Sequence, residues 1–187
     1  AINSNAHALA RYSALVQESG MVPIVEPEVL MDGAHSADVC LSKTSGVISK
    51  CFEELILHKV DLSGIILKPN MILSGNQSKE KISSEEIADK TLECLKNSVP
   101  SDVPGIAFLS GGQSEVEATE NLNLINKKNN TNFIMTYSYG RALQQSSLRV
   151  WSKNTQDIEI TQKTFNHRAK MCTLAAQGEW MSELENK

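Results

Sequence analysis

A lysine stands at the end of an apolar run, where a charged side chain is costly. Residues 65–67 are Ile-Ile-Leu, Lys68 follows them, and Pro69 ends the run. One interpretation is a surface lysine whose ammonium reaches solvent past the edge of a sheet. The other is a nucleophile of the Schiff-base kind, because burial disfavours the charged ammonium and favours the neutral amine that attacks a carbonyl. Position alone leaves both interpretations open.

Two acids follow another apolar run, with a proline between them. Glu26 and Glu28 flank Pro27, and residues two apart in a strand face the same side. Both carboxylates are therefore predicted to point into one space. Two close carboxylates do not both ionise easily, which makes one of them a candidate general acid or base. The alternative is a pair of exposed acids at the start of a loop.

Two glycine-containing turns have the composition of anion sites. In "LSGGQS" (109–114), the backbone N–H groups of Ser110, Gly111 and Gly112 can form an anion nest at a helix N-terminus, although a tight turn also explains the glycines. In "SYGRAL" (138–143), Gly140 precedes Arg141 in the first turn of a predicted helix. A cation there opposes the helix dipole, which predicts an anion beside it.

The elements that must position these residues alternate along the chain. Continuous apolar runs predict strands buried on both faces of a parallel sheet. Helical patterns lie between them, and one begins with a capping box formed by Ser83 and Glu86. The strands are expected within 21–28, 63–70, 103–114 and 132–141, and the helices at 5–19, 36–59, 83–99, 114–128, 141–151 and 158–177.

A barrel is favoured over an open sheet because every predicted strand ends in residues of chemical interest. Barrel enzymes build sites from several strand ends, whereas an open sheet concentrates its ligand at one switch point. A barrel of this kind has eight strands and only four are predicted here, so we expect half a barrel. If these are the last four strands, the two glycine turns follow strands seven and eight, whose loops often bind phosphate in barrels.

Composition excludes several classes of protein. The chain has 187 residues with 41% hydrophobic content, which suits one domain over 1–187; we expect its polar tail, 178–187, to be frayed. The net charge is −4 and the basic residues are scattered, so no nucleic-acid partner is expected. No run of about 18 apolar residues and no signal-peptide pattern is present, which indicates a cytoplasmic protein without a membrane partner.

The cysteines and histidines give no sign of a metal site. The cysteines form no CxxC pair, and we interpret them as buried, reduced thiols. The histidines show no second ligand at metal spacing, so no metal and no cofactor are expected. The residues concerned are Cys40, Cys51, Cys94, Cys172, His7, His35, His58 and His167.

Four segments together resemble class I fructose 1,6-bisphosphate aldolases. "GMVPIVEPEVL", "GIILKPNM", "FLSGGQSEVEATENLNLIN" and "YSYGRALQQSSLRVW" occur in the family's order, and "NAHALARY" fits the segment before them. The resemblance implies a TIM barrel and a glycolytic lyase that cleaves fructose 1,6-bisphosphate to dihydroxyacetone phosphate and glyceraldehyde 3-phosphate. It also implies a homotetramer. Because the family's barrel is about twice this length, the chain is expected to be its C-terminal half, with the N-terminal half as a partner.

The resemblance assigns roles by position. Lys68 matches the Schiff-base lysine and Glu26 the acid/base that helps dehydrate the carbinolamine, with Glu28 beside it tuning the lysine network. The matching positions for the substrate's C1 phosphate are Ser110, Gly111, Gly112, Ser138, Gly140 and Arg141. Two other functions remain open: a phosphate-binding module or scaffold without catalysis, and a different Schiff-base barrel enzyme such as a transaldolase.

Overall fold

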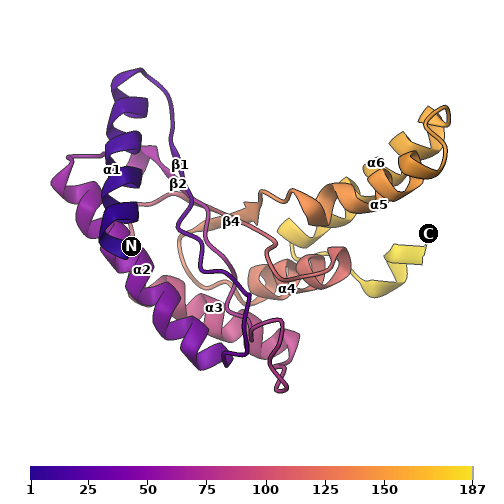
Figure 1. The fold of residues 1–187 in the computed structure, drawn as a ribbon, viewed down its shortest axis with the longest axis horizontal. Helices are drawn as coiled ribbons and strands as arrows, with labels where there is room; N and C mark the ends of the chain where they lie inside the picture. The colour runs from indigo at the N-terminus through magenta and orange to yellow at the C-terminus, as the bar shows by residue number, and fades with distance from the viewer. Residues whose placement is uncertain (187) are drawn as a thin grey trace.

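Four short parallel strands lie side by side in chain order in the computed structural model, which describes residues 1–186 (Figure 1). Their register aligns Ile24, Ile66, Gly105 and Ile134 across the sheet. The strands are shorter than the apolar runs, partly because Pro27 and Pro69 lack the N–H that a ladder needs. They are β1 (Ile24–Val25), β2 (Ile66–Leu67), β3 (Gly105–Phe108) and β4 (Ile134–Tyr137).

Each crossover between neighbouring strands contains a helix, which confirms the predicted βα order. The capping box of Ser83 with Glu86 is present, and Ser114 forms a second with Glu117. The first helix begins three residues before the predicted start, and no side chain caps it. The helices are α1 (Ile2–Glu18), α2 (Ala37–Leu57), α3 (Ser84–Ser98), α4 (Glu115–Lys128), α5 (Arg141–Lys153) and α6 (Ile158–Ala176), with short 3₁₀ turns at Leu62–Gly64 and Ser182–Asn186.

The core lies between one face of the sheet and the helices. Val25, Leu67 and Ile106 are fully buried on that face. The prediction of strands buried on both faces is wrong for β1 and β4, because Ile24 is 45% and Ile134 is 74% exposed on the other face. That is the face a closed eight-stranded barrel encloses. The four strands of the described residues form an open sheet, so this face stays exposed.

The C-terminal segment packs against the helices instead of fraying. Trp180 is buried, and its indole Nε1 donates to Glu185 Oε1 at 2.8 Å. Arg168 on α6 donates to both oxygens of Glu185, at 2.6 and 2.8 Å. A buried ring and a two-pronged ion pair outweigh the entropy of a chain end. This corrects the expected frayed tail for 178–186, while Lys187 lies outside the described residues.

The described helices include none that is both long and apolar enough to cross a membrane. All four cysteines are buried free thiols, as predicted, and burial raises the pKa of Cys51 to about 11.

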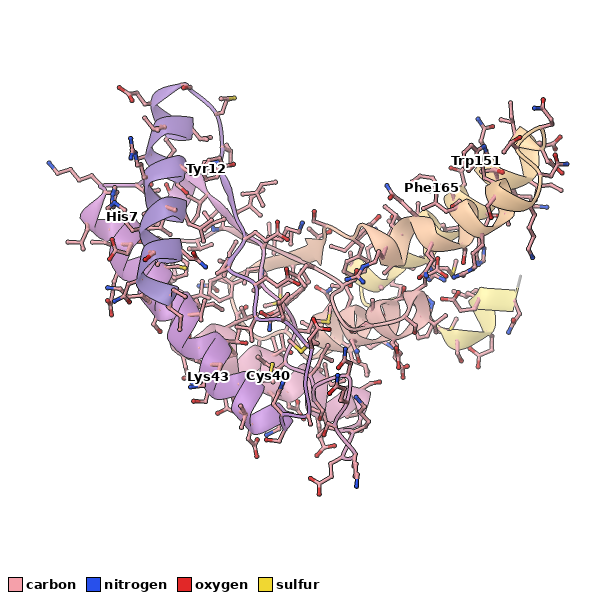
Figure 2. The ribbon with its side chains drawn as sticks, in the orientation of Figure 1. His7, Tyr12, Cys40, Lys43, Trp151 and Phe165 are labelled. Atoms are coloured by element: carbon pink, nitrogen blue, oxygen red, sulfur yellow. The ribbon has the colours of Figure 1, made fainter. Side chains whose placement is uncertain are left out.

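Helices α5 and α6 pair and extend away from the sheet (Figure 1). Trp151 and Phe165 lie on this pair, whereas His7 and Tyr12 lie on α1 at the opposite end (Figure 2).

Candidate active site

Lys68 and Glu26 meet where two adjacent strands end. Val25 pairs with Leu67, so the residue that follows each is also a neighbour across the two strands. Adjacent strands lie about 4.8 Å apart, and Lys68 Nζ lies 3.0 Å from Glu26 Oε1. The Lys68 side chain is 19% exposed and that of Glu26 is 44% exposed. The carboxylate is therefore within direct proton-transfer distance of the lysine nitrogen.

Glu28 shares the space of Glu26, as the alternation of the strand predicted. Both acids are exposed, whereas Val25 before them and Pro27 between them are buried. Both line one cavity of ≈ 260 Å³, whose other walls come from α1 and α2. Glu28 also lies against the first glycine turn, because a Cβ on Gly111 would be 2.9 Å from Glu28 Oε1. A side chain at position 111 would displace this carboxylate.

Asn70 ties the loop after the lysine to the loop after the acids. It is 2% exposed, and its Oδ1 accepts a hydrogen bond from Val29 N at 3.0 Å. Its Nδ2 donates to Thr44 Oγ1 at 3.0 Å and to Met71 O at 3.1 Å. A buried amide with all these partners fixes the two loops relative to each other. The sequence analysis did not single out this residue, although it follows Lys68-Pro69 directly.

The first glycine turn could bind an anion through its own backbone N–H groups, and not through a free helix N-terminus. Gln113 N donates to Ser110 O at 3.1 Å, which closes the turn, and Ser110 is 9% exposed. Gly112 has φ +80, and a Cβ there would lie 2.7 Å from Met31 Cβ. The capping box of Ser114 and Glu117 already occupies the N-terminus of α4. An anion here would therefore be bound by the N–H groups of the loop.

The second glycine turn leads into an uncapped helix. Ser138 N donates to Phe108 O at 2.9 Å, which places this loop beside the end of β3. Gly140 is the N-cap of α5 and no side chain caps that helix. Arg141 is exposed, and the salt bridges of the described residues do not include it. A helix N-terminus without a cap beside a solvated arginine is a suitable anion site.

Glu115 joins the helices that follow the two glycine turns. It begins α4 and is 9% exposed, and its carboxylate accepts from the backbone and hydroxyl of Ser146 and from Arg149, both on α5. Burial raises the pKa of Glu115, but the hydrogen bonds from Ser146 and Arg149 outweigh it and hold the pKa below its ordinary value. The sequence analysis missed this link because the partners are 31 and 34 residues away.

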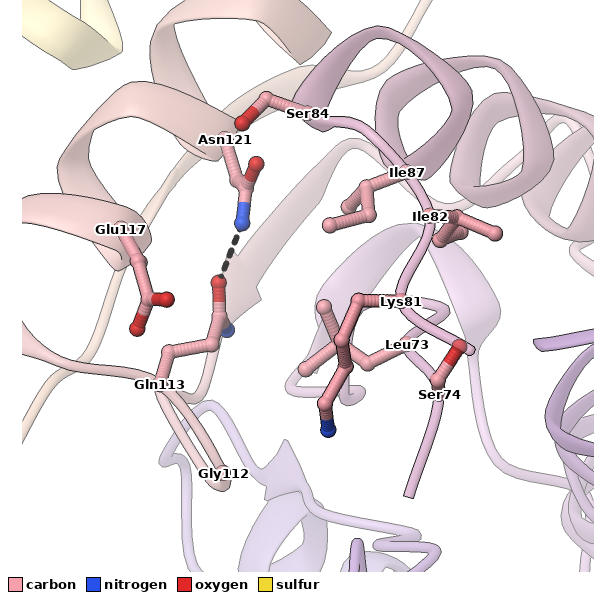
Figure 3. A pocket seen from close by; sticks show the side chains of 10 residues that line it. All are labelled: Leu73, Ser74, Lys81, Ile82, Ser84, Ile87, Gly112, Gln113, Glu117 and Asn121. Atoms are coloured by element: carbon pink, nitrogen blue, oxygen red, sulfur yellow. Dashed lines mark hydrogen bonds between the residues drawn. The ribbon is translucent and has the colours of Figure 1, made fainter. Parts of the chain in front are cut away.

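A second cavity lies behind the first glycine turn. It measures ≈ 190 Å³ and is lined by Gly112, Gln113, Lys81 and Asn121, among others (Figure 3). Asn121 Nδ2 donates to Gln113 Oε1 at 2.7 Å, and Lys81 Nζ donates to Gly75 O at 2.6 Å. The first contact ties the residue after the turn to α4, and the second holds the loop that contains Gly75 on the other wall of this cavity.

Two of the histidines differ from the prediction that no histidine has a second metal ligand nearby. No second ligand was expected at metal spacing, yet His7, Glu54 and His58 bring their donor atoms together. The sequence did not reveal this because His7 lies 47 residues from Glu54, and only the packing of α1 on α2 joins them. His167 lies 4.0 Å from Glu185 instead.

Comparison with known proteins gives consistent similarity over the whole chain. The family model described as "Fructose-bisphosphate aldolase class-I" matches residues 1–187. "Fructose-bisphosphate aldolase 4, cytosolic" of Arabidopsis thaliana is 46% identical over 186 residues, covering 99% of this chain and 47% of the relative. The fructose-bisphosphate aldolase of Dictyostelium discoideum is 44% identical over 182 residues, covering 97% of this chain and 51% of the relative.

A solved structure confirms the fold. The fructose-bisphosphate aldolase of Plasmodium falciparum, solved in complex with TRAP and a small-molecule inhibitor, superposes with a TM-score of 0.93 at 40% identity. The match covers 97% of this chain and 52% of that one. That aldolase is a TIM barrel, so the predicted barrel class is confirmed. The chain spans about half the length of the relatives it matches.

Proposed function

The chain belongs to the class I fructose-bisphosphate aldolase family, and from this premise we propose that the protein is an aldehyde-lyase of glycolysis. It cleaves fructose 1,6-bisphosphate to dihydroxyacetone phosphate and glyceraldehyde 3-phosphate through a Schiff base on Lys68. The observation that carries the proposal is the position of Lys68 Nζ, 3.0 Å from Glu26 Oε1 at the ends of adjacent strands.

The chemistry begins with attack by the neutral amine of Lys68 on the keto carbon of the sugar. Glu26 donates the proton with which the carbinolamine hydroxyl leaves as water, and an iminium forms. The iminium draws in the electron pair of the C3–C4 bond as that bond breaks, and the C4 hydroxyl gives its proton to the Glu26 carboxylate left by the dehydration, so that C4 becomes the aldehyde. It thereby supplies the electron sink, and the step needs no metal ion or other cofactor. Glu28, which lies beside Gly111, tunes the hydrogen bonds and charges around Lys68.

The C1 phosphate of the substrate binds between the two glycine turns. Ser110, Gly111 and Gly112 offer backbone N–H groups and a hydroxyl, and Arg141 offers a guanidinium beside the uncapped start of α5. Ser138 and Gly140 complete the second turn. Glu115 keeps the two helices behind these turns in register, which supports a shared phosphate site.

The architecture and setting are part of the same proposal. Residues 1–187 are one domain that supplies the C-terminal half of a (β/α)₈ barrel. The exposed face at Ile24 and Ile134 supports a further half that encloses it. The protein acts on a small sugar phosphate in the cytoplasm and assembles as a homo-oligomer, without nucleic-acid or membrane partners. Relatives with "cytosolic" in their names support the location.

Trapping the Schiff base tests the proposal. The protein is incubated with dihydroxyacetone phosphate and reduced with borohydride, and the adduct is mapped by mass spectrometry. We expect the adduct on the peptide containing Lys68, none in Lys68→Met, and full labelling in Lys43→Met, whose lysine is exposed on α2. Glu26→Gln should slow adduct formation about 100-fold or more.

Two results would refute parts of the proposal. An adduct on another lysine, or none from the folded protein, would remove Lys68 as the nucleophile. An adduct on Lys68 without cleavage of fructose 1,6-bisphosphate would favour the phosphate-binding scaffold instead.

A further inference from the structure

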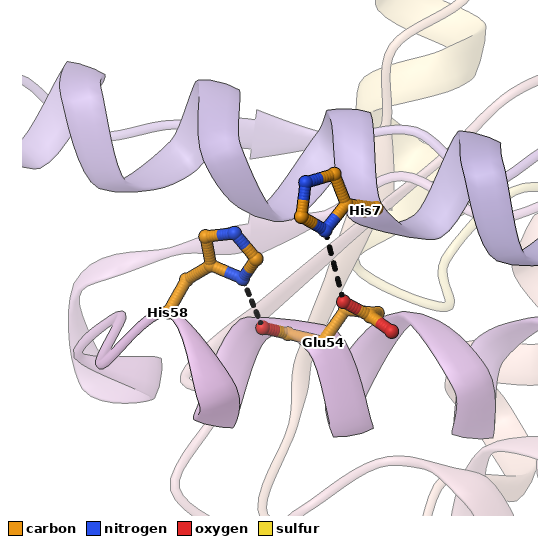
Figure 4. Close-up of side chains that lie close together, drawn as sticks. All are labelled: His7, Glu54 and His58. Carbon is orange, nitrogen blue, oxygen red and sulfur yellow. Dashed lines mark hydrogen bonds and ion pairs between the residues drawn. The ribbon is translucent and has the colours of Figure 1, made fainter.

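Three side chains of types that can bind a metal ion lie close together where α1 packs on α2. His7 comes from α1, Glu54 from the last turns of α2, and His58 caps that helix (Figure 4). One donor atom from each lies within 4.8 Å of the other two. We propose that His7, Glu54 and His58 form a binding site for a divalent transition-metal ion such as Zn²⁺. Two imidazoles and one carboxylate suit this class of ion, and water would complete the coordination.

The orientation of His58 supports the proposal. Its Nδ1 lies 2.9 Å from the backbone oxygen of Glu54, so Nδ1 carries the proton and donates. Nε2 is then the free acceptor, and it faces α1 on the side of His7 (Figure 4). Histidines that bind metals usually donate their other ring N–H to a carbonyl or carboxylate in this way. The supporting contact of one ligand is thus already formed.

Glu54 is placed to serve as the anionic ligand. Its side chain is 14% exposed, and Lys50 contacts Oε1 at 3.2 Å. The other oxygen, Oε2, lies 3.3 Å from His7 Nδ1. An ordinary glutamate side chain is ionised at neutral pH, so the carboxylate carries a charge. One oxygen is therefore balanced by Lys50, and the other lies beside the His7 imidazole.

The donors need only a small movement to close on an ion. Zn²⁺ ligands at about 2.1 Å from the metal lie about 3.4 Å from one another in a tetrahedral site, which is less than the 4.8 Å limit here. The His7 side chain is 59% exposed, and its ring meets that of His58 edge-on, with centroids 4.8 Å apart. Rotation of an exposed side chain supplies the movement and leaves an open side for water.

A bound ion would cross-link α1 to α2. These helices also wall the cavity that contains Glu26 and Glu28, through Asn5 on α1 and Val47 on α2 among others. The link would restrain the two walls relative to each other. An ion that links two helices raises the free energy of unfolding, because the unfolded chain does not hold the three donors together. The gain grows with the affinity for the ion and with its concentration.

Zinc binding and thermal unfolding test the proposal. The purified protein is freed of metal with a chelator and titrated with ZnCl₂ by calorimetry, and its Tm is measured with and without excess Zn²⁺. We expect one site per chain and a Tm increase of several degrees. His7→Ala and His58→Ala should each weaken binding at least about 10-fold. His167→Ala, a histidine on α6, is the matched control and should bind like the parent.

The outcome decides the proposal even if one variant folds poorly. His7 is largely exposed, so His7→Ala should keep the Tm of the metal-free parent and gives an interpretable result alone. Magnesium, which prefers oxygen ligands, should give no increase in Tm. Absence of a one-to-one zinc site, or zinc binding that survives both His7→Ala and His58→Ala, would overturn the assignment. This test is independent of the proposed lyase activity.

Discussion

Replacement of Asn70 by alanine tests whether one buried amide holds together the loop that follows Lys68 and the loop that follows Glu28. Asn70→Ala removes the acceptor of Val29 N and the donor to both Thr44 Oγ1 and Met71 O. A buried polar group that loses its partner costs about 1–3 kcal/mol. Thr44 is fully buried, whereas the bond to Val29 N is only partly buried, so the sum is about 2–5 kcal/mol. That is a large fraction of the stability of an ordinary domain.

Chemical denaturation with a matched control measures the effect. Asn76 also bridges two loops, accepting from Gly33 N and donating to Asp32, but its hydrogen bonds are exposed. Asn76→Ala should therefore cost less than about 1 kcal/mol. We expect Asn70→Ala to lower the denaturation midpoint far more, and to slow borohydride trapping on Lys68 because the loops lose their common anchor. Equal losses of stability in the two variants would refute the reasoning.

Two further predictions concern the glycine turns. Gly112→Ala should destabilise the protein by about 1–3 kcal/mol in thermal unfolding, because the φ is positive and the new Cβ would lie 2.7 Å from Met31 Cβ; a neutral result would contradict the geometry of the turn. Glu115→Gln should cost about 1–3 kcal/mol at neutral pH. Because the folded-state pKa of Glu115 is lowered, its contribution is complete above about pH 4.5 and is lost as the pH falls through the folded value. The stability gap between parent and variant should therefore narrow in acid, and a gap that stays constant with pH would exclude this carboxylate as its cause.

Local signals in the sequence determined the elements and the kinds of residue at their ends. Ser83 and Ser114 each stand three residues before a glutamate, and both form capping boxes. Apolar runs that end in Lys68 or in Glu26 predict strands whose last residues face a site. Such signals are readable because caps, prolines and glycine turns act within a few residues of the chain. The order of the motifs along the chain also identifies the family.

Only the tertiary structure decided which of these residues meet. The ion pair of Lys68 with Glu26 depends on the register of two strands, and the role of Asn70 depends on Val29 and Thr44, 41 and 26 residues away. Helix packing alone joins His7 to Glu54 across 47 residues. A sequence pattern specifies which face of an element is buried, but many arrangements of faces satisfy the same pattern. Register and side-chain packing select one of them, and the distances between functional atoms follow from that selection.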